Sequence, residues 1–225
     1  MTTNRSLLAA AMLAAAFLTT SLSAHADGFD ARPVTIETRD GLASVVLTNP
    51  GDRKIYLETQ VYGWSQDAAG QNVLVESDTA VASPPAMWMG PHSTYNLRVK
   101  LPGGSPGQEQ AFRVLIKQLP DRSDIQAGRI VFALTQSLPA FVEPADLGPP
   151  TLRGRLTDAR RILISNDGGR RARLANVSQD GRVVAPGLIG YALGHSTLAI
   201  VLPAPIHAGA IEVETDVGRR TVEVR

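Results

Sequence analysis

The sequence contains no cysteine. Without thiols there is no disulfide framework, no thiolate metal site and no cysteine nucleophile, so the chain has to fold on its apolar core alone. An excess of one charge is also missing, because 22 Lys+Arg stand against 21 Asp+Glu and no charge run stands out. This balance gives no electrostatic reason to expect a nucleic acid or an anionic membrane as partner.

Assembled catalytic motifs are missing as well. The histidines beyond the first 26 residues, His92, His195 and His207, lie close to Gly or Pro and lack metal-ligand spacing. There is no G-x-S-x-G elbow, and the glycine-rich stretch 103–107 lacks the Lys-Ser/Thr of a phosphate loop. We therefore expect a protein that is not an enzyme and that uses neither a cofactor nor a metal.

The N-terminal residues have the pattern of a secretory signal. A short start with Arg5 precedes an apolar run at 7–22, and Ala24, His25 and Ala26 form an A-x-A cleavage site. The run is shorter than the ~20 residues that span a bilayer. We predict a signal peptide over 1–26, and no membrane insertion of the chain once it is cleaved.

The remaining sequence is rich in strand and turn signals. Residues 54–64, 94–101 and 110–117 alternate and carry many β-branched and aromatic side chains, while NPGD at 49–52 is strong turn chemistry. No helical period is evident. Short strands at turn-to-turn spacings of about 8–12 residues are typical of a sandwich or barrel. The sequence therefore predicts an all-β fold.

A proline-rich stretch divides the strand pattern. Residues 145–150 contain two prolines and a glycine, which favours a linker. We expect one β-sandwich domain over 27–144, the linker, and a smaller β-domain over 151–225. One large β-domain is the alternative.

Five segments resemble a known family. They are LTNPGD at 47–52, YGWSQ at 62–66, VASPP at 81–85, QAFR running to LP over 110–120, and SLPAFVEP at 137–144. Their order and spacing are similar to those of periplasmic fimbrial chaperones, the PapD-like family, and the WSQ and SLPxFVxP patterns resemble its archaic, Csu-type branch.

This resemblance implies two immunoglobulin-like domains in a boomerang arrangement. In the family, the last strand of the first domain is lent to a fimbrial subunit that lacks its own final strand. The chaperone works in the periplasm and delivers the subunit to an outer-membrane usher. Fimbrial subunits and the usher are therefore the expected partners.

The residues of the presumed donor strand suit such strand addition. Ile130, Phe132 and Leu134 alternate, so all three point to one side of a strand. Leu138 would continue the series across Gln136. The alternative is an ordinary sandwich strand whose apolar face is internal. The smaller residues of the other parity are expected to face the protein's own core: Val131, Ala133 and Thr135.

The chain departs from the better-known branch at the residues that anchor the subunit's C-terminal carboxylate. Thr35 and Pro139 stand where that branch has Arg and Lys. A carboxylate in a cleft needs charge-assisted donors. The candidates are Arg113, Arg98 and Arg32, with Arg39 as a further one.

Glu143 stands where the better-known branch often has Arg. We therefore expect the buried salt bridge between the domains of that branch to be absent. A different reading of the whole chain remains open, namely a secreted β-sandwich binding module, adhesin-like or carbohydrate-binding, in which Trp64 and Trp88 stack on a sugar.

Overall fold

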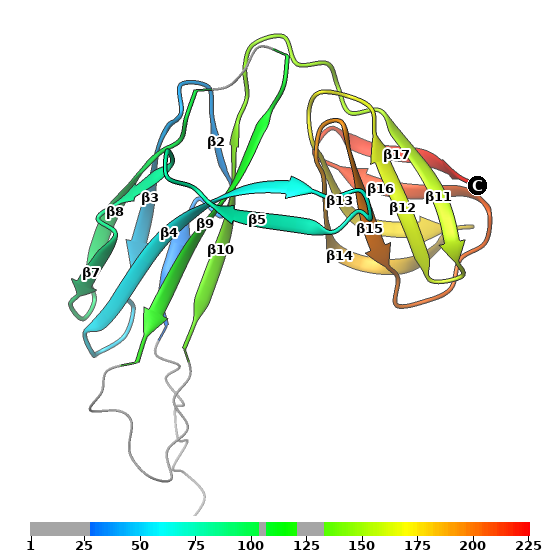
Figure 1. Cartoon of the computed structure of the whole chain (residues 1–225). Coiled ribbons are helices and arrows are strands. Elements are labelled where there is room, and N and C mark those ends of the chain that lie inside the picture. The colour runs from blue at the N-terminus through cyan, green and yellow to red at the C-terminus, as the bar shows by residue number, and fades with distance from the viewer. Residues whose placement is uncertain (1–27, 104–106, 121–132) are drawn as a thin grey trace, which may run out of the picture.

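The computed structural model describes residues 28–103, 107–120 and 133–225. The expected signal peptide lies outside the described residues. Within them, every regular element is a strand, and the strands gather in two lobes set at an angle (Figure 1). No helix in the described part of the chain is long and apolar enough to cross a membrane. The predicted fold class, all-β with two immunoglobulin-like domains in a boomerang arrangement, is confirmed.

The first domain consists of two facing sheets. The four-stranded sheet has the order β1-β3-β8-β6, and the six-stranded sheet has the order β2-β10-β9-β4-β5, with β7 also paired to β4. The strands are β1 (Asp30–Arg32), β2 (Ile36–Thr38), β3 (Leu42–Thr48), β4 (Ile55–Gln66), β5 (Asn72–Glu76), β6 (Val81–Ser83), β7 (Ala86–Met89), β8 (Thr94–Lys100), β9 (Gln110–Leu119) and β10 (Thr135–Val142).

Alternation and turn chemistry explain why these residues form these strands. Along β9, Val114 and Ile116 are fully buried in the core, while the residues between them are more exposed. After β3 the side chain of Asn49 accepts a hydrogen bond from the N–H of Gly51 and donates to the carbonyl of Gly90 at 2.8 Å. This Asx turn ends the strand and ties it to the loop before β8.

The second domain has one continuous sheet of seven strands in the order β14-β13-β16-β17-β11-β12-β15, and its end strands β14 and β15 lie against each other around a separate apolar core. The strands are β11 (Leu152–Asp158), β12 (Arg161–Asn166), β13 (Ala172–Gln179), β14 (Arg182–Ala192), β15 (Ser196–Val201), β16 (Gly209–Thr215) and β17 (Gly218–Val224). Residues 27–144 and 151–225 remain our proposed domain limits.

Burial along β10 and the residues just before it does not alternate as expected, because residues 133–135 are exposed on both faces and residues 138–142 are buried on both. Leu138 is 4% exposed and belongs to the core of the first domain with Ala140, whereas Ala133 and Thr135 are exposed. The expectation that Leu138 is presented to a partner is therefore wrong, and so is the one that Ala133 and Thr135 face the core. Alternation alone identifies the two faces of a strand, but the packing of the second sheet decides which of them is internal.

Candidate functional site between the two domains

An aromatic cluster joins the two domains. Trp64 at the end of β4 and Phe141 at the end of β10 come from the first domain, and Tyr191 at the end of β14 comes from the second. The ring centroids are 5.8 Å apart for Trp64–Phe141, 5.8 Å for Trp64–Tyr191 and 5.5 Å for Phe141–Tyr191. Tilted and edge-on contacts at these distances are favourable beyond simple burial. All three rings are buried, with Leu193 beside them.

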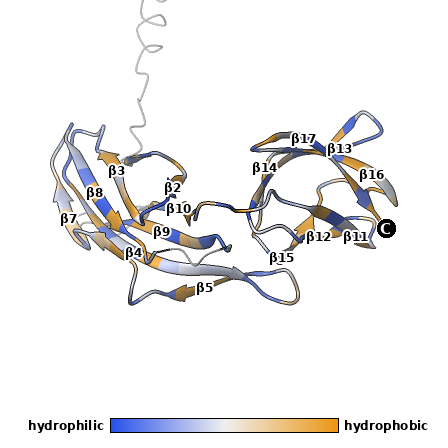
Figure 2. Cartoon of the chain, turned by 90° about the horizontal axis from the view of Figure 1, so that it is seen from above, coloured by the Kyte–Doolittle hydropathy of each residue, from blue (hydrophilic) through white to orange (hydrophobic). Residues whose placement is uncertain are grey.

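The β4–β5 hairpin extends this junction. It projects from the first domain toward the second (Figure 2). The side-chain amide of Gln66 donates to the carbonyl of Tyr191 at 2.7 Å and accepts from the N–H of Leu193 at 3.1 Å. At the hairpin turn, the carbonyl of Gly70 accepts from the N–H of Ala199 at 2.9 Å. Gly70 has a positive φ, and a Cβ there would lie 2.6 Å from the Ala199 nitrogen, so glycine is required.

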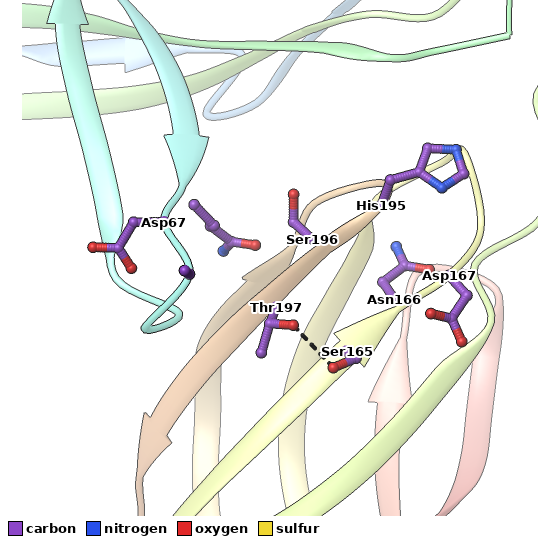
Figure 3. A pocket seen from close by; sticks show the side chains of 9 residues that line it. Asp67, Ser165, Asn166, Asp167, His195, Ser196 and Thr197 are labelled. Atoms are coloured by element: carbon purple, nitrogen blue, oxygen red, sulfur yellow. Dashed lines mark hydrogen bonds between the residues drawn. The ribbon is translucent and has the colours of Figure 1, made fainter.

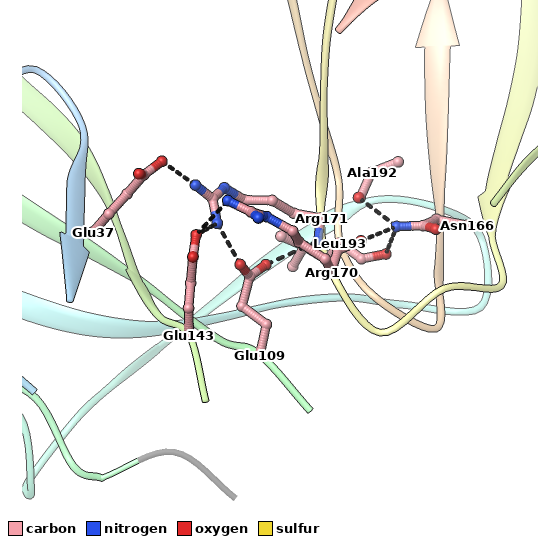
Figure 4. A network of polar contacts seen from close by, with 8 residues as sticks. All are labelled: Glu37, Glu109, Glu143, Asn166, Arg170, Arg171, Ala192 and Leu193. Carbon is pink, nitrogen blue, oxygen red and sulfur yellow. Dashed lines mark hydrogen bonds and ion pairs between the residues drawn. The ribbon is translucent and has the colours of Figure 1, made fainter. Parts of the chain in front are cut away.

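A charge cluster of Glu37, Glu109, Glu143, Arg170 and Arg171 forms the other half of the junction (Figure 4). Arg171 is the centre of the cluster, with its side chain 2% exposed and ion pairs to all three glutamates of the first domain. Its Nη1 donates to Glu143 at 2.6 Å, and its backbone N–H donates to Glu109 at 3.0 Å. Arg170 adds a contact to Glu143 at 3.2 Å.

A turn that begins at Asn166 positions Arg170 and Arg171. The buried side chain of Asn166 at the end of β12 donates to the carbonyl of Arg170 at 2.7 Å and to those of Ala192 and Leu193 at 3.1 and 3.2 Å. Its oxygen accepts from the N–H of Gly168. The NDGG turn therefore holds Arg170 and the following Arg171 toward the first domain.

Burial dominates the protonation equilibria of this cluster. Desolvation raises the pKa of the Glu109 carboxyl, and the attraction of Arg171 offsets only part of that rise. Desolvation also lowers the pKa of Arg171, but the charges and hydrogen bonds of the three glutamates outweigh it, so the net shift is upward. Arg171 is thus charged throughout, and Glu109 is the group of the cluster that protonates more readily than usual.

The expectation that Glu143 removes the buried salt bridge between the domains is therefore wrong. Glu143 does lie at the junction, but the second domain presents the cations Arg170 and Arg171 to it. The carboxylate comes from the first domain and the guanidinium from the second. The presence of Glu143 in the sequence could not reveal that the second domain places two arginines opposite it.

Arg113 on β9 is the second guanidinium at the aromatic cluster. Its Cζ lies 3.8 Å from the Trp64 ring centroid, and burial lowers its pKa. Among the described residues it has neither an ion pair nor a hydrogen-bond partner for its side chain. In the antiparallel pairing of β9 with β10, Arg113 stands directly opposite Pro139, so both side chains are on the same face. The expected lysine position is thus next to an arginine of the neighbouring strand.

The other predicted anchors are not brought to this place. Arg98 and Arg32 are exposed on β8 and β1, which belong to the four-stranded sheet, whereas Arg113 is on the six-stranded sheet. Arg39 is exposed just after β2. Among the four candidates, Arg113 alone combines partial burial with a place at the domain junction.

The predicted donor residues fall into three groups. Ile130 and Phe132 lie outside the described residues. Leu134, just before β10, is 38% exposed, and its carbonyl accepts from the N–H of Gln118 at 2.8 Å. Leu138 is internal. The structure therefore describes one exposed apolar side chain of the predicted series.

A polar cavity of about 440 Å³ lies beside the hairpin turn, between the two domains (Figure 3). The hydroxyls of Ser165 and Thr197, which are paired on the neighbouring strands β12 and β15, hydrogen-bond on its wall at 2.9 Å. Within the described ranges, no group of three or more His, Asp or Glu side chains could hold a metal. The residues that line the cavity are Gln66, Asp67, Ala68, Ser165, Asn166, Asp167, His195, Ser196 and Thr197.

The two tryptophans differ in their surroundings. Trp64 is 5% exposed inside the aromatic cluster, so its faces are unavailable for stacking on a sugar. Trp88 on β7 is 54% exposed, tilted against Tyr56 at 5.0 Å, with the ammonium of Lys54 4.5 Å from its ring centroid. Of the two tryptophans named for a sugar site, only Trp88 is therefore exposed.

Comparisons with known proteins bear on this arrangement. A family described as pili and flagellar-assembly chaperone, PapD N-terminal domain, matches residues 30–148. No curated protein matches the chain.

Solved structures that resemble the chain include the CsuC–CsuE chaperone–tip adhesion subunit pre-assembly complex from archaic chaperone-usher Csu pili of Acinetobacter baumannii. The identity is 20%, the match covers 88% of this chain and 99% of that chain, and the TM-score is 0.71. The SafB chaperone in complex with the SafA pilin of Salmonella enterica has 17% identity, coverage of 88% and 97%, and a TM-score of 0.65. At these identities the likeness shows a shared two-domain fold.

Proposed function

The chain belongs to the PapD-related family of pili and flagellar-assembly chaperones, and on that premise we propose that it binds fimbrial subunits in the periplasm. It does so by donor-strand complementation and then delivers them to an outer-membrane usher. Two of the similar structures are complexes of a chaperone with a pilin or with a tip adhesion subunit. They support a subunit as the partner.

One observation carries the strand-donor role, namely the open edge of β10. β9 pairs with β10 over its whole length, from Thr135 to Val142, but β2 pairs only with Ala140, Phe141 and Val142. From Thr135 to Pro139, no strand among the described residues pairs with the second edge of β10. An unpaired edge offers backbone groups to another chain.

The side chains of this segment agree with that role. Leu134 has the same parity as Leu138 and Ala140, which are buried in the core of the first domain. At Leu134 the same face of the chain emerges from the core and becomes exposed. The series continues in the sequence with Phe132 and Ile130. Burial of each such side chain in a subunit's groove contributes about 1.5–3 kcal/mol before ordering costs.

We assign the carboxylate anchor to Arg113. It is partly buried, it carries a charge without a counter-ion among the described residues, and it stands opposite Pro139 on the face where the family has its lysine. An arginine can hold a carboxylate through two parallel N–H donors. The C-terminus of a subunit strand added along β10 would then end at the domain junction.

Co-expression with a fimbrial subunit tests the donor role. The double variant Phe132→Glu/Leu134→Glu should reduce recovery of the subunit in complex with the chain by at least tenfold, because two buried apolar contacts are replaced by charges. Leu42→Glu is the matched control, since Leu42 is an exposed leucine on the four-stranded sheet. Unchanged recovery in the double variant would contradict the proposed mechanism.

A further inference from the structure

We propose that Tyr191 is a second donor to the carboxylate that Arg113 binds, so that the bound subunit's C-terminus joins the two domains. The inference rests on the proposed chaperone function, because the carboxylate is that of the subunit. It extends the proposed function, because Tyr191 belongs to the second domain, which would then contact the subunit's carboxylate directly.

The positions of the two groups support this assignment. Arg113 packs on the face of Trp64, and Tyr191 meets the same ring nearly at a right angle, with an interplanar angle of 84°. Burial lowers the pKa of Arg113, and the Tyr191 phenol interacts with the guanidinium and opposes that lowering. The phenol of one domain therefore lies within electrostatic reach of the guanidinium of the other.

Both groups retain donors that a ligand can use. Among the described residues, the polar side-chain atoms that are fully enclosed and lack a partner belong to Gln110, Gln118, Arg170 and Arg171. The Tyr191 hydroxyl is not among them, although no described residue hydrogen-bonds to it, so the hydroxyl keeps contact with solvent. The ring is buried and the hydroxyl is reachable, which is the arrangement of an oriented donor.

The backbone around Tyr191 is held by the first domain. Gln66 donates to the carbonyl of Tyr191 and accepts from the N–H of Leu193. Asn72 on β5 in turn accepts hydrogen bonds from Trp64 at 2.9 Å and from Gln66 at 3.2 Å. These contacts orient Tyr191 before a ligand arrives, which reduces the ordering cost of binding.

The consequence is a reciprocal coupling between ligand and domain arrangement. If the carboxylate accepts from one residue of each domain, binding stabilises the arrangement that brings Arg113 and Tyr191 together. The same arrangement must then raise the affinity for the carboxylate by an equal factor. The charge cluster around Arg171, which holds the domains in this arrangement, thereby favours subunit binding without touching the subunit.

The absence of cysteine in the chain allows a direct test. Leu42→Cys and Val201→Cys, exposed sites in the two domains, can carry a pair of spin labels. A short peptide of alternating threonine and valine is added with a free C-terminal carboxylate or with a C-terminal amide. The affinity and the distribution of label distances are measured for the labelled chain with Tyr191 intact and for Tyr191→Phe, which keeps the ring and removes the hydroxyl.

We expect the free-acid peptide to narrow the distance distribution when Tyr191 is intact and the amide not to do so. In Tyr191→Phe the affinity for the free-acid peptide should fall about tenfold, which is the effect of one hydrogen bond to a charged group. At a saturating concentration of this peptide, the distance distribution between the labels should no longer narrow. If the free acid is preferred equally with and without the hydroxyl, the inference on Tyr191 is wrong and the chaperone proposal stands. If neither peptide form is preferred when Tyr191 is intact, the carboxylate anchor itself is wrong.

Discussion

Two guanidinium groups pack against the same aromatic cluster, and they differ in their partners. Arg171 lies 3.8 Å from the Phe141 centroid, and Arg113 lies 3.8 Å from the Trp64 centroid. Arg171 makes ion pairs with three glutamates of the other domain, whereas Arg113 has no ion pair among the described residues. The paired cation holds the two domains together, and the unpaired one is left with its donors free for a ligand.

The protein tolerates the unpaired charge because of its position. Arg113 is only partly buried, and the face of Trp64 attracts a cation, which together limit the desolvation cost. Arg171 is almost completely enclosed and could not be charged there without its carboxylates. Burial and pairing therefore separate the structural arginine from the one that we propose to bind the carboxylate at the same junction.

The strongest test of this comparison replaces each arginine by methionine. Arg171→Met should lower the free energy of unfolding by about 3–5 kcal/mol, because it leaves carboxylates without their cation at a buried site. Arg113→Met, the matched control on the same cluster, should change it by no more than about 1 kcal/mol, the worth of one cation–π contact. Chemical denaturation of both variants measures the difference.

Equal losses in the two variants would contradict this division. A large loss in Arg113→Met alone would mean that Arg113, and not Arg171, holds the junction. The same experiment also tests the reversed polarity of the interdomain salt bridge, since Arg171 is its only fully buried cation among the described residues.

A smaller effect is expected from pH. Because burial raises the pKa of Glu109 above its ordinary value of 4.5, the folded chain binds this proton more tightly than the unfolded chain. The contribution of Glu109 to stability is therefore fully present below pH 4.5 and is lost as the pH rises through the raised pKa. Glu109→Gln has no such proton, so the stability of the unsubstituted chain relative to this variant should fall as the pH rises toward 7.

Unfolding curves of both proteins across this pH range give the relative stability. A relative stability that rises with pH would show that the attraction of Arg171 exceeds the burial term. The pKa of Glu109 would then be lowered, and the cluster would be stabilised by its full negative charge.

Turn chemistry and alternation allowed strands and turns of both domains to be predicted. Asn49 and Asn166 each end a strand in a turn that the sequence marks, with NPGD and NDGG. The alternation over 110–117 predicted a strand, and the structure has β9 there with Val114 and Ile116 in the core. The role of Leu138 was predicted wrongly, because Leu134 and Leu138 have the same parity and the same chemistry, and only the position of the facing sheet makes one exposed and the other buried.

The charge cluster was beyond the reach of sequence reasoning. Arg171 follows two glycines and an arginine in a stretch that reads as a surface turn. Its partners Glu143, Glu109 and Glu37 lie 28, 62 and 134 positions away in the sequence. Contacts of such separation depend on how the two domains pack. Arg113, in contrast, could be named as a candidate anchor, because the family resemblance places the subunit's carboxylate near its strand.

The most direct test of the division between the two arginines is the affinity of the Arg113→Met variant for a free-acid peptide relative to its amide. A calorimetric titration of the unsubstituted chain should show a preference for the free acid of about ten- to a hundredfold, the worth of charge-assisted hydrogen bonds. In Arg113→Met this preference should vanish while the fold is retained. A variant that kept the full preference would show that the carboxylate binds elsewhere.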